Sequence, residues 1–119
     1  MGRGRRNKMK KFIVIYITPK EALEKMKDKT PEEMKKSMGP WMAWMAKIGD
    51  SLVDMGAPLG KVQNVTNSGS IEGSDNVGGY SILQAESMDG ALKLLEGHPH
   101  LSWSEDCSIS VYEMMPMPS

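Results

Sequence analysis

The stretch Lys11-Phe-Ile-Val-Ile-Tyr-Ile-Thr18 decides the fold of this chain. Its β-branched and aromatic residues favour a strand, the run is too short for a stable helix, and Pro19 ends it. Successive side chains of a strand point to opposite faces, so this strand has apolar residues on both faces. We therefore expect a buried central strand over residues 11–18.

The clearest helix signal follows at Thr30-Pro31-Glu32-Glu33, which supplies an N-cap hydroxyl, a proline at the first helical position and a capping-box glutamate. Pro40 has no N–H to donate to the carbonyl of Lys36, so we expect a kink or break near Gly39. Gly49 is expected to end the helix. Large apolar residues recur every three or four positions and predict one buried helix face, made of Met34, Met38, Trp41, Met45 and Ile48.

Turn-forming residues separate the remaining elements. Ser87 is a good N-cap for a second helix that Gly97 ends, and residues 98–107 are expected to form a loop. Residues 67–79 are rich in Gly, Ser and Asn and predict a loop or hairpin tip. For residues 21–27, a short helix and a surface insertion both remain open. The further strands are expected at 51–55, 61–66, 80–85 and 108–114.

This order of elements, β-α-β-(β)-β-α-β, predicts an α+β fold. Two helices separated by pairs of strands are typical of the ferredoxin-like split βαβ arrangement, an antiparallel sheet with two helices on one face. The other face of such a sheet also needs cover. A second copy of the chain can supply it, so we expect a homodimer with sheet packed on sheet.

Length and charge limit the classes of protein. The 119 residues suit one domain, expected over residues 9–119. Residues 1–8 are basic and are expected to be a disordered N-terminal extension. Without the four cations of that extension, 11 basic side chains remain against 15 acidic ones, which makes a nucleic-acid partner unlikely. Those four cations are Arg3, Arg5, Arg6 and Lys8.

Cysteine content and hydropathy bear on the compartment. Cys107 is the single cysteine, so an intrachain disulfide is excluded and a reducing, cytoplasmic location is expected. Residues 1–8 contain no apolar run of the kind that a secretory signal needs. No segment approaches the roughly 18 consecutive apolar residues of a membrane span, so no membrane association is expected.

Five segments, taken in order, resemble the YCII-related (DGPF-domain) family. The similarity covers residues 9–117, and the family implies a dimeric α+β barrel with a pocket between the sheet and the first long helix. The segments are Met9-Lys-Lys-Phe-Ile-Val-Ile-Tyr, Trp41-Met-Ala-Trp-Met-Ala-Lys-Ile-Gly-Asp, Gly56-Ala-Pro-Leu-Gly-Lys, Gly79-Tyr-Ser-Ile-Leu-Gln-Ala-Glu-Ser-Met-Asp and Ile109-Ser-Val-Tyr-Glu-Met-Met-Pro.

The chain departs from that family where catalysis is concerned. An enzymatic role in the family is inferred from a His–Asp pair, but residues 41–48 contain no histidine where some relatives carry one. The Asp-Gly-Pro-Phe signature appears only in the stretched form Asp54-Met-Gly-Ala-Pro-Leu. The resemblance therefore transfers no catalytic histidine to this chain.

The catalytic candidates are His98, His100 and Asp54. In an extended segment, residues two apart point to the same side, so both imidazoles could converge on one site as a general base or metal ligands. Alternatively, His98 ends a helix and is partly protonated beside its negative end. Two histidines alone do not make a zinc site, so no metal and no cofactor are expected.

The pocket candidates are Trp44, Tyr80 and Asp50. Trp41 belongs to the apolar stripe of the first helix and is expected in the core, whereas Trp44 lies off that stripe and is expected to line a pocket or a dimer contact. Asp50 and Asp54 bracket the second strand, where a role in a turn is the alternative to a role in the site. The twelve methionines suit both core filling and an adaptable ligand pocket.

Two functional hypotheses follow, since the sequence contains no dinucleotide fingerprint, phosphate-binding loop or nucleophile elbow. The first is a small cofactor-independent enzyme that acts on a small organic metabolite by acid/base chemistry. The alternative is a non-catalytic ligand-binding or interaction module. A cluster of His98 and Asp54 beside a concave pocket favours the enzyme, and histidines that point to solvent favour the module.

Overall fold

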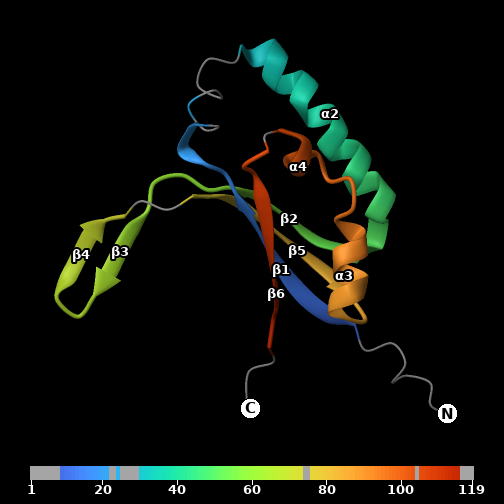
Figure 1. Ribbon diagram of the computed structural model, residues 1–119. Coiled ribbons are helices and arrows are strands. Elements are labelled where there is room, and N and C mark those ends of the chain that lie inside the picture. The colour runs from blue at the N-terminus through green and yellow to red at the C-terminus, as the bar shows by residue number, and fades with distance from the viewer. Residues whose placement is uncertain (1–8, 22–23, 25–29, 74–75, 104, 116–119) are drawn as a thin grey trace.

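A four-stranded antiparallel sheet, in the order β2-β5-β1-β6, carries its helices on one face (Figure 1). The computed structural model describes residues 9–21, 24, 30–73, 76–103 and 105–115. The elements are β1 (Lys10–Ile17), α2 (Pro31–Ile48), the 3₁₀ turn η2 (Gly49–Ser51), β2 (Leu52–Pro58), β3 (Gln63–Thr66), β4 (Gly69–Glu72), β5 (Val77–Ala85), α3 (Met88–Leu94), α4 (Pro99–Trp103) and β6 (Ser108–Glu113).

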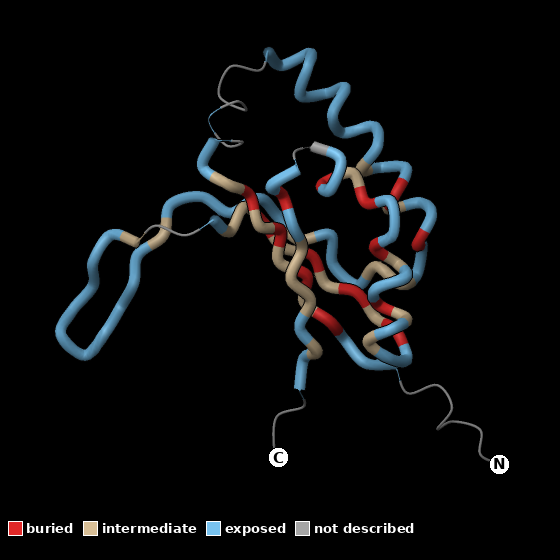
Figure 2. Tube along the Cα trace, viewed as in Figure 1, coloured by how far each residue is buried: buried red, intermediate tan, exposed pale blue. Residues whose placement is uncertain are grey.

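The predicted α+β class with an antiparallel sheet is confirmed, and the arrangement is compatible with a ferredoxin-like fold. Strand β1 lies at the centre of the sheet, as predicted, between β5 and β6. Phe12 and Val14 are fully buried beneath the helices, whereas Ile13 and Ile15 lie on the opposite face and are half-buried (Figure 2). The helices therefore cover one face of β1 only.

Helix α2 begins at the predicted capping box. The amide of Glu33 donates to Oγ1 of Thr30 at 3.1 Å, and the amide of Thr30 donates to Oε1 of Glu33 at 3.2 Å. Gly49 ends the helix with a positive φ of 53°. The predicted break at Pro40 is absent, because residues 31–40 are exposed and water can hydrate the carbonyl that the proline leaves without a partner.

The predicted buried face of α2 is confirmed in the second half of the helix, where Ile48 is buried and Trp41 and Met45 pack against the core, and it is wrong in the first half. Met34 and Met38 remain about half exposed, and the buried residues of the helix are Trp44 and Ile48. The N-terminal half of α2 extends past the sheet, so only the second half packs on it (Figure 1). The helix therefore overhangs open space near its start and is fixed to the core near its end.

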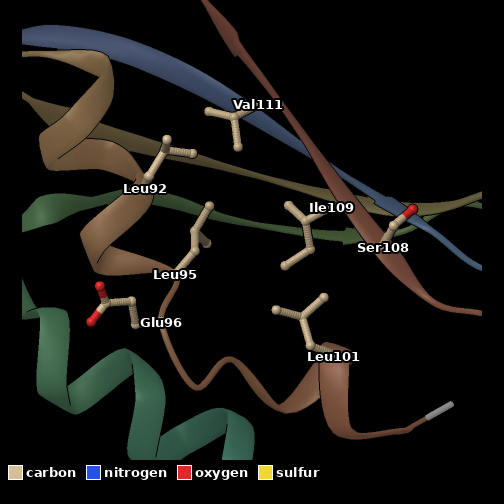
Figure 3. Close-up of a pocket in the computed structure, with 7 residues that line it drawn as sticks. All are labelled: Leu92, Leu95, Glu96, Leu101, Ser108, Ile109 and Val111. Carbon is tan, nitrogen blue, oxygen red and sulfur yellow. The ribbon is translucent and has the colours of Figure 1, made fainter. Parts of the chain in front are cut away.

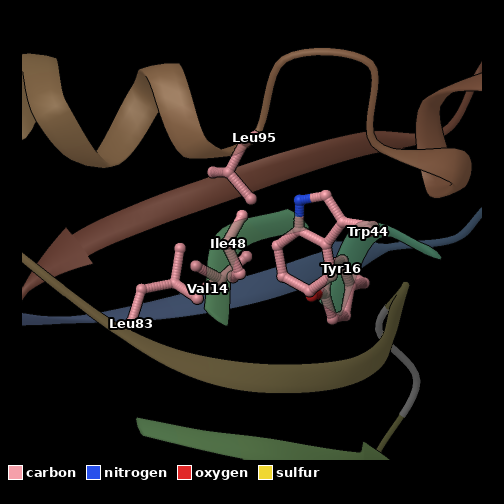
Figure 4. Packing of buried hydrophobic residues seen from close by; sticks show 6 residues of the cluster. All are labelled: Val14, Tyr16, Trp44, Ile48, Leu83 and Leu95. Atoms are coloured by element: carbon pink, nitrogen blue, oxygen red, sulfur yellow. The ribbon is translucent and has the colours of Figure 1, made fainter. Parts of the chain in front are cut away.

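The main core lies between α2, α3 and the covered face of the sheet. Trp44 packs there and its indole N–H donates to the carbonyl oxygen of Leu94 at 2.7 Å. Figure 4 shows the side chains that meet at this point, namely Val14, Tyr16, Trp44, Ile48, Leu83 and Leu95. The C-terminal half of α2 is thereby held to α3 as well as to the sheet.

The start of α3 agrees with the sequence-based prediction, whereas helix α4 differs from it. The Ser87 hydroxyl accepts from the amide of Gly90 and begins α3 as predicted. Helix α4 was not predicted, because five residues carry too little periodicity to reveal a helix. Strand β3 lies within the strand predicted at 61–66 and pairs with β4 in the Gly-rich region, and this hairpin projects from the sheet and is exposed throughout (Figure 1). Residues 1–8 and most of 21–27 lie outside the described residues.

Candidate functional site

A cavity of about 830 Å³ lies between α2 and the adjoining end of the sheet. The first half of α2 overhangs this space, and Met34 and Met38 form part of its wall. On the sheet side it is lined by Tyr16 of β1, by Thr18, which follows β1, and by Ser81 of β5. Its volume lies in the range of about 300–1,000 Å³ that is typical of small-molecule sites.

Both candidate histidines lie beside this cavity and are buried. His98 is 0% exposed and His100 is 3% exposed, and their ring centroids are 6.5 Å apart. Each ring also packs on Tyr16, at centroid distances of 5.1 and 5.2 Å. The predicted convergence is therefore observed, although α4 begins between the two residues and the segment is not an extended one.

The hydrogen bonds of His98 define its tautomer. Its Nδ1 accepts from the backbone N–H of His100 at 3.0 Å, so Nδ1 carries no hydrogen and the neutral ring is protonated at Nε2. Burial, and then the charge of His100, lower the pKa of His98 to about 4. His98 is therefore neutral at neutral pH, which contradicts the interpretation of a partly protonated residue at the helix end.

The Nε2–H of His98 is a buried donor that has no hydrogen-bond partner among the described residues. The imidazole is enclosed by the rings of Trp44, Trp41 and Tyr16, at centroid distances of 4.3, 4.6 and 5.1 Å. Aromatic faces accept hydrogen bonds only weakly. A buried donor without a partner costs about 1–3 kcal/mol, so this N–H calls for an explanation.

His100 has a structural role in addition to its place in the cavity lining. Its Nε2 lies 3.0 Å from the carbonyl oxygens of Ile17 and Ser108, and therefore carries the hydrogen that it donates to them. These contacts connect α4 to the ends of β1 and β6. Burial lowers the pKa of His100, and its bonds to the two carbonyls oppose that shift.

A chain of hydroxyl groups crosses the floor of the cavity. The Ser81 hydroxyl donates to the carbonyl oxygen of Met55 at 2.9 Å, so the Tyr16 hydroxyl donates to Ser81 Oγ at 2.8 Å. Burial raises the pKa of Tyr16, against the opposing effect of this bond. The Tyr16 oxygen keeps its lone pairs as acceptors, while its hydrogen is already donated.

The two aspartate candidates lie outside the lining of the cavity. Asp54 is exposed, and its Oδ1 accepts from the amide of Gly56 at 2.8 Å, as in a turn. Within the described residues, no hydrogen bond or ion pair connects Asp54 to His98. Asp50 is exposed as well, and its backbone carbonyl accepts from the Gln84 side chain. The structure does not bring the predicted Asp–His pair together.

The two aromatic pocket candidates line the cavity, in different ways. Trp44 contributes from the core side. Tyr80 lies on β5 opposite Ile15, so strand alternation places its ring on the uncovered face, and its backbone borders the cavity. Sequence reasoning missed Ser81 and Tyr16 because both lie in strands read as core. The signal that could have found them is a hydroxyl at an inward position of a strand.

A second, smaller cavity of about 430 Å³ lies between α3, α4 and β6 (Figure 3). Its apolar side chains point toward one another, and its described lining residues include no histidine or cysteine. The described residues form no group of three or more His, Cys, Asp or Glu that could hold a metal ion. The described part of the chain also has no helix long and apolar enough to cross a membrane.

Comparison with known proteins does not assign this chain to a family. No family model matches the sequence, and no curated protein is significantly similar to it. The resemblance to the YCII-related family therefore stays a prediction.

Proposed function

We propose that this protein binds a small, largely apolar organic molecule in the cavity beneath α2. The observation that carries this proposal is the cavity itself, which combines a volume of about 830 Å³ with walls of tryptophan and methionine. Aromatic side chains offer large contact areas, and thioethers adapt to a ligand at low cost. A few hydroxyl groups on the sheet side would orient the ligand.

The hydrogen bonding of the site favours binding over catalysis by His98. A general base needs an accessible lone pair, but Nδ1 of His98 accepts from His100 and Nε2 carries the hydrogen. Asp54, the predicted orienting acid, bonds to Gly56 instead. A ligand-binding module is therefore the function that the geometry supports best.

An acid/base enzyme for the same class of molecule is the second candidate, since Tyr16 and His100 line the cavity with titratable groups. Enolisation of a bound ketone can be followed as deuterium exchange at its α-carbon in D₂O. An enzyme would accelerate this exchange, and Tyr16→Phe would remove the acceleration if the hydroxyl takes part. Exchange at the buffer rate would leave binding as the function.

A cavity-filling substitution with a matched control tests the proposed binding. Ala43 lines the cavity from α2, whereas Ala46 lies one turn further along the same helix, is equally exposed and does not line it. We expect Ala43→Phe to weaken the binding of acetophenone, followed by tryptophan fluorescence, at least tenfold. Ala46→Phe should leave binding unchanged. Equal affinities of the two variants would contradict the proposed site.

A further inference from the structure

The buried N–H of His98 lies directly behind the wall of the proposed ligand cavity. All three residues whose rings enclose it, Tyr16, Trp41 and Trp44, line the cavity. The ring nitrogen Nε2 has no acceptor in the described residues, and the side chain is 0% exposed. A ligand that reached this nitrogen would supply the acceptor that it lacks.

Trp41 is the part of this wall that can move most easily. Its side chain is partly exposed, whereas Trp44 and Tyr16 are each 5% exposed. Trp41 follows Gly39 and Pro40, where the helix lacks one backbone hydrogen bond and no other element of the described residues packs against the glycine. The helix beyond this point is held by the bond from Trp44 to Leu94.

The polar groups of the cavity specify what a ligand must offer. The hydroxyl hydrogens of Tyr16 and Ser81 are already donated, the first to Ser81 and the second to Met55. These hydroxyl groups therefore offer a ligand acceptors only, whereas the Nε2–H of His98 is a donor without a described partner, and a ligand that contacts it must present an acceptor.

The charges of the lining favour an uncharged ligand. Lys47 and Glu96 are the described lining residues that are charged at neutral pH, and both are exposed. A carboxylate beside His98 would lose its hydration without a cation in contact to replace it. A carbonyl oxygen accepts the hydrogen bond without that cost.

We infer that the cavity selects neutral molecules that combine an aromatic ring with a carbonyl group. The Trp41 ring swings away, the ligand ring packs against Trp44 and Tyr16 in its place, and the Nε2–H of His98 donates to the carbonyl oxygen. This inference rests on the proposed function and adds the class of ligand to it.

Two isosteric probes test the selection. Acetophenone carries the carbonyl, and α-methylstyrene has the same shape with a methylene group in place of the oxygen. We divide the dissociation constant of acetophenone by that of α-methylstyrene. This ratio should rise about fivefold from wild type to His98→Asn, the change expected for the loss of one neutral hydrogen bond. The asparagine oxygen can still accept from the amide of His100, so this variant removes the Nε2 donor and keeps the turn.

The control variant is Met34→Leu, which changes the cavity wall at nearly constant volume and leaves the donor in place. It should alter the two affinities together and leave their ratio as in the wild type. If both probes bind and the ratio is the same in wild type and His98→Asn, the inference is overturned while the proposed function stands. If neither probe binds, both are overturned.

A measurement on the wild type covers the case in which His98→Asn does not fold. The Nε2 proton of His98 is observable by NMR because the ring is buried. Acetophenone should move this proton downfield and slow its exchange with solvent, and α-methylstyrene should not. Equal responses to both probes would overturn the inference without any substitution.

Discussion

The indole N–H of Trp44 donates to the carbonyl oxygen of Leu94 at 2.7 Å, across fifty positions of the sequence. Trp44 lies in the second half of α2 and Leu94 ends α3, so one bond connects these two helices above the sheet. Since the first half of α2 is exposed, this bond and the packing around it anchor the whole helix.

Trp44→Phe should therefore destabilise the protein by about 1–3 kcal/mol, because it leaves the Leu94 carbonyl without its partner and removes part of a buried ring. Urea unfolding measures the change. Trp41→Phe is the matched control, since the Trp41 ring is only partly buried. A Trp41→Phe loss as large as that of Trp44→Phe would contradict the anchoring role.

Stability should fall on acidification through His98. The pKa of His98 in the folded protein is about 4, below the ordinary value of 6.5. The imidazole therefore binds a proton more readily in the unfolded chain than in the folded one. The free energy of unfolding should therefore fall as the pH drops below 6.5 and level off below about pH 4. The total fall should be on the order of 3 kcal/mol. Urea titrations of wild type and His98→Asn at pH 7 and 4.5 check this, and parallel losses in both proteins would exclude His98 as the cause.

Two glycines should respond differently to alanine. Gly39 lies on the exposed part of α2 and, apart from its chain neighbours and the helix's own backbone, nothing lies within 4 Å of a Cβ placed there. The gain in helix propensity of Gly39→Ala is offset by the contact of the new methyl group with the ring of Pro40, so we expect stability to change by less than about 1 kcal/mol. At Gly56, φ is +75° and a Cβ would overlap the carbonyl oxygen of Tyr80. Gly56→Ala should destabilise by more than about 2 kcal/mol. Thermal unfolding of the two variants checks this, and a loss for Gly39→Ala as large as that for Gly56→Ala would contradict it.

The hydroxyl chain predicts coupling between Tyr16 and Ser81. Tyr16→Phe should cost about 1 kcal/mol, whereas Ser81→Ala should cost more because it leaves both the tyrosine hydroxyl and the Met55 carbonyl without a partner. A double-mutant cycle with urea unfolding gives the coupling, expected at about 0.5–2 kcal/mol. Additive costs would mean that the bond contributes nothing.

The uncovered face of the sheet predicts a homodimer. Ile13 lies there opposite Ile82, and Ile15 opposite Tyr80, while the labelled helices lie on the other face of the sheet (Figure 1). Sedimentation should give a dimer at micromolar concentration, and Ile15→Glu should convert it to a monomer. Met42→Glu, on the exposed side of α2, should leave the dimer intact. A folded wild-type monomer would contradict this prediction.

Local signals in the sequence predicted the elements well. The capping box at Thr30, the N-cap at Ser87 and the C-cap at Gly49 each act within one helical turn, so neighbouring residues suffice to reveal them. The central position of β1 follows from its apolar run. The buried face of α2 was predicted correctly for the second half of the helix only, because the periodicity of Met34 and Met38 does not reveal that the sheet ends beneath them.

The candidate site was predicted in part, for the same reason. His98 and His100 converge as expected, because a two-residue spacing keeps them close in any short segment. Contacts between residues far apart in the chain decide that Asp54 makes no bond to His98. They also decide that Tyr16 and Ser81 belong to the site. Residue types and spacing contain no direct record of such contacts.

The projecting hairpin β3–β4 has a consequence for chain connectivity. All its residues are exposed, and the amide of Leu59 donates to the carbonyl oxygen of Gly78 at 3.0 Å where the chain leaves and rejoins the sheet. The two ends of the segment that carries the hairpin are therefore already adjacent, and a short turn could join them without moving β2 or β5. The same segment can accept a longer insert, such as a reporter domain, while the four-stranded sheet keeps its register.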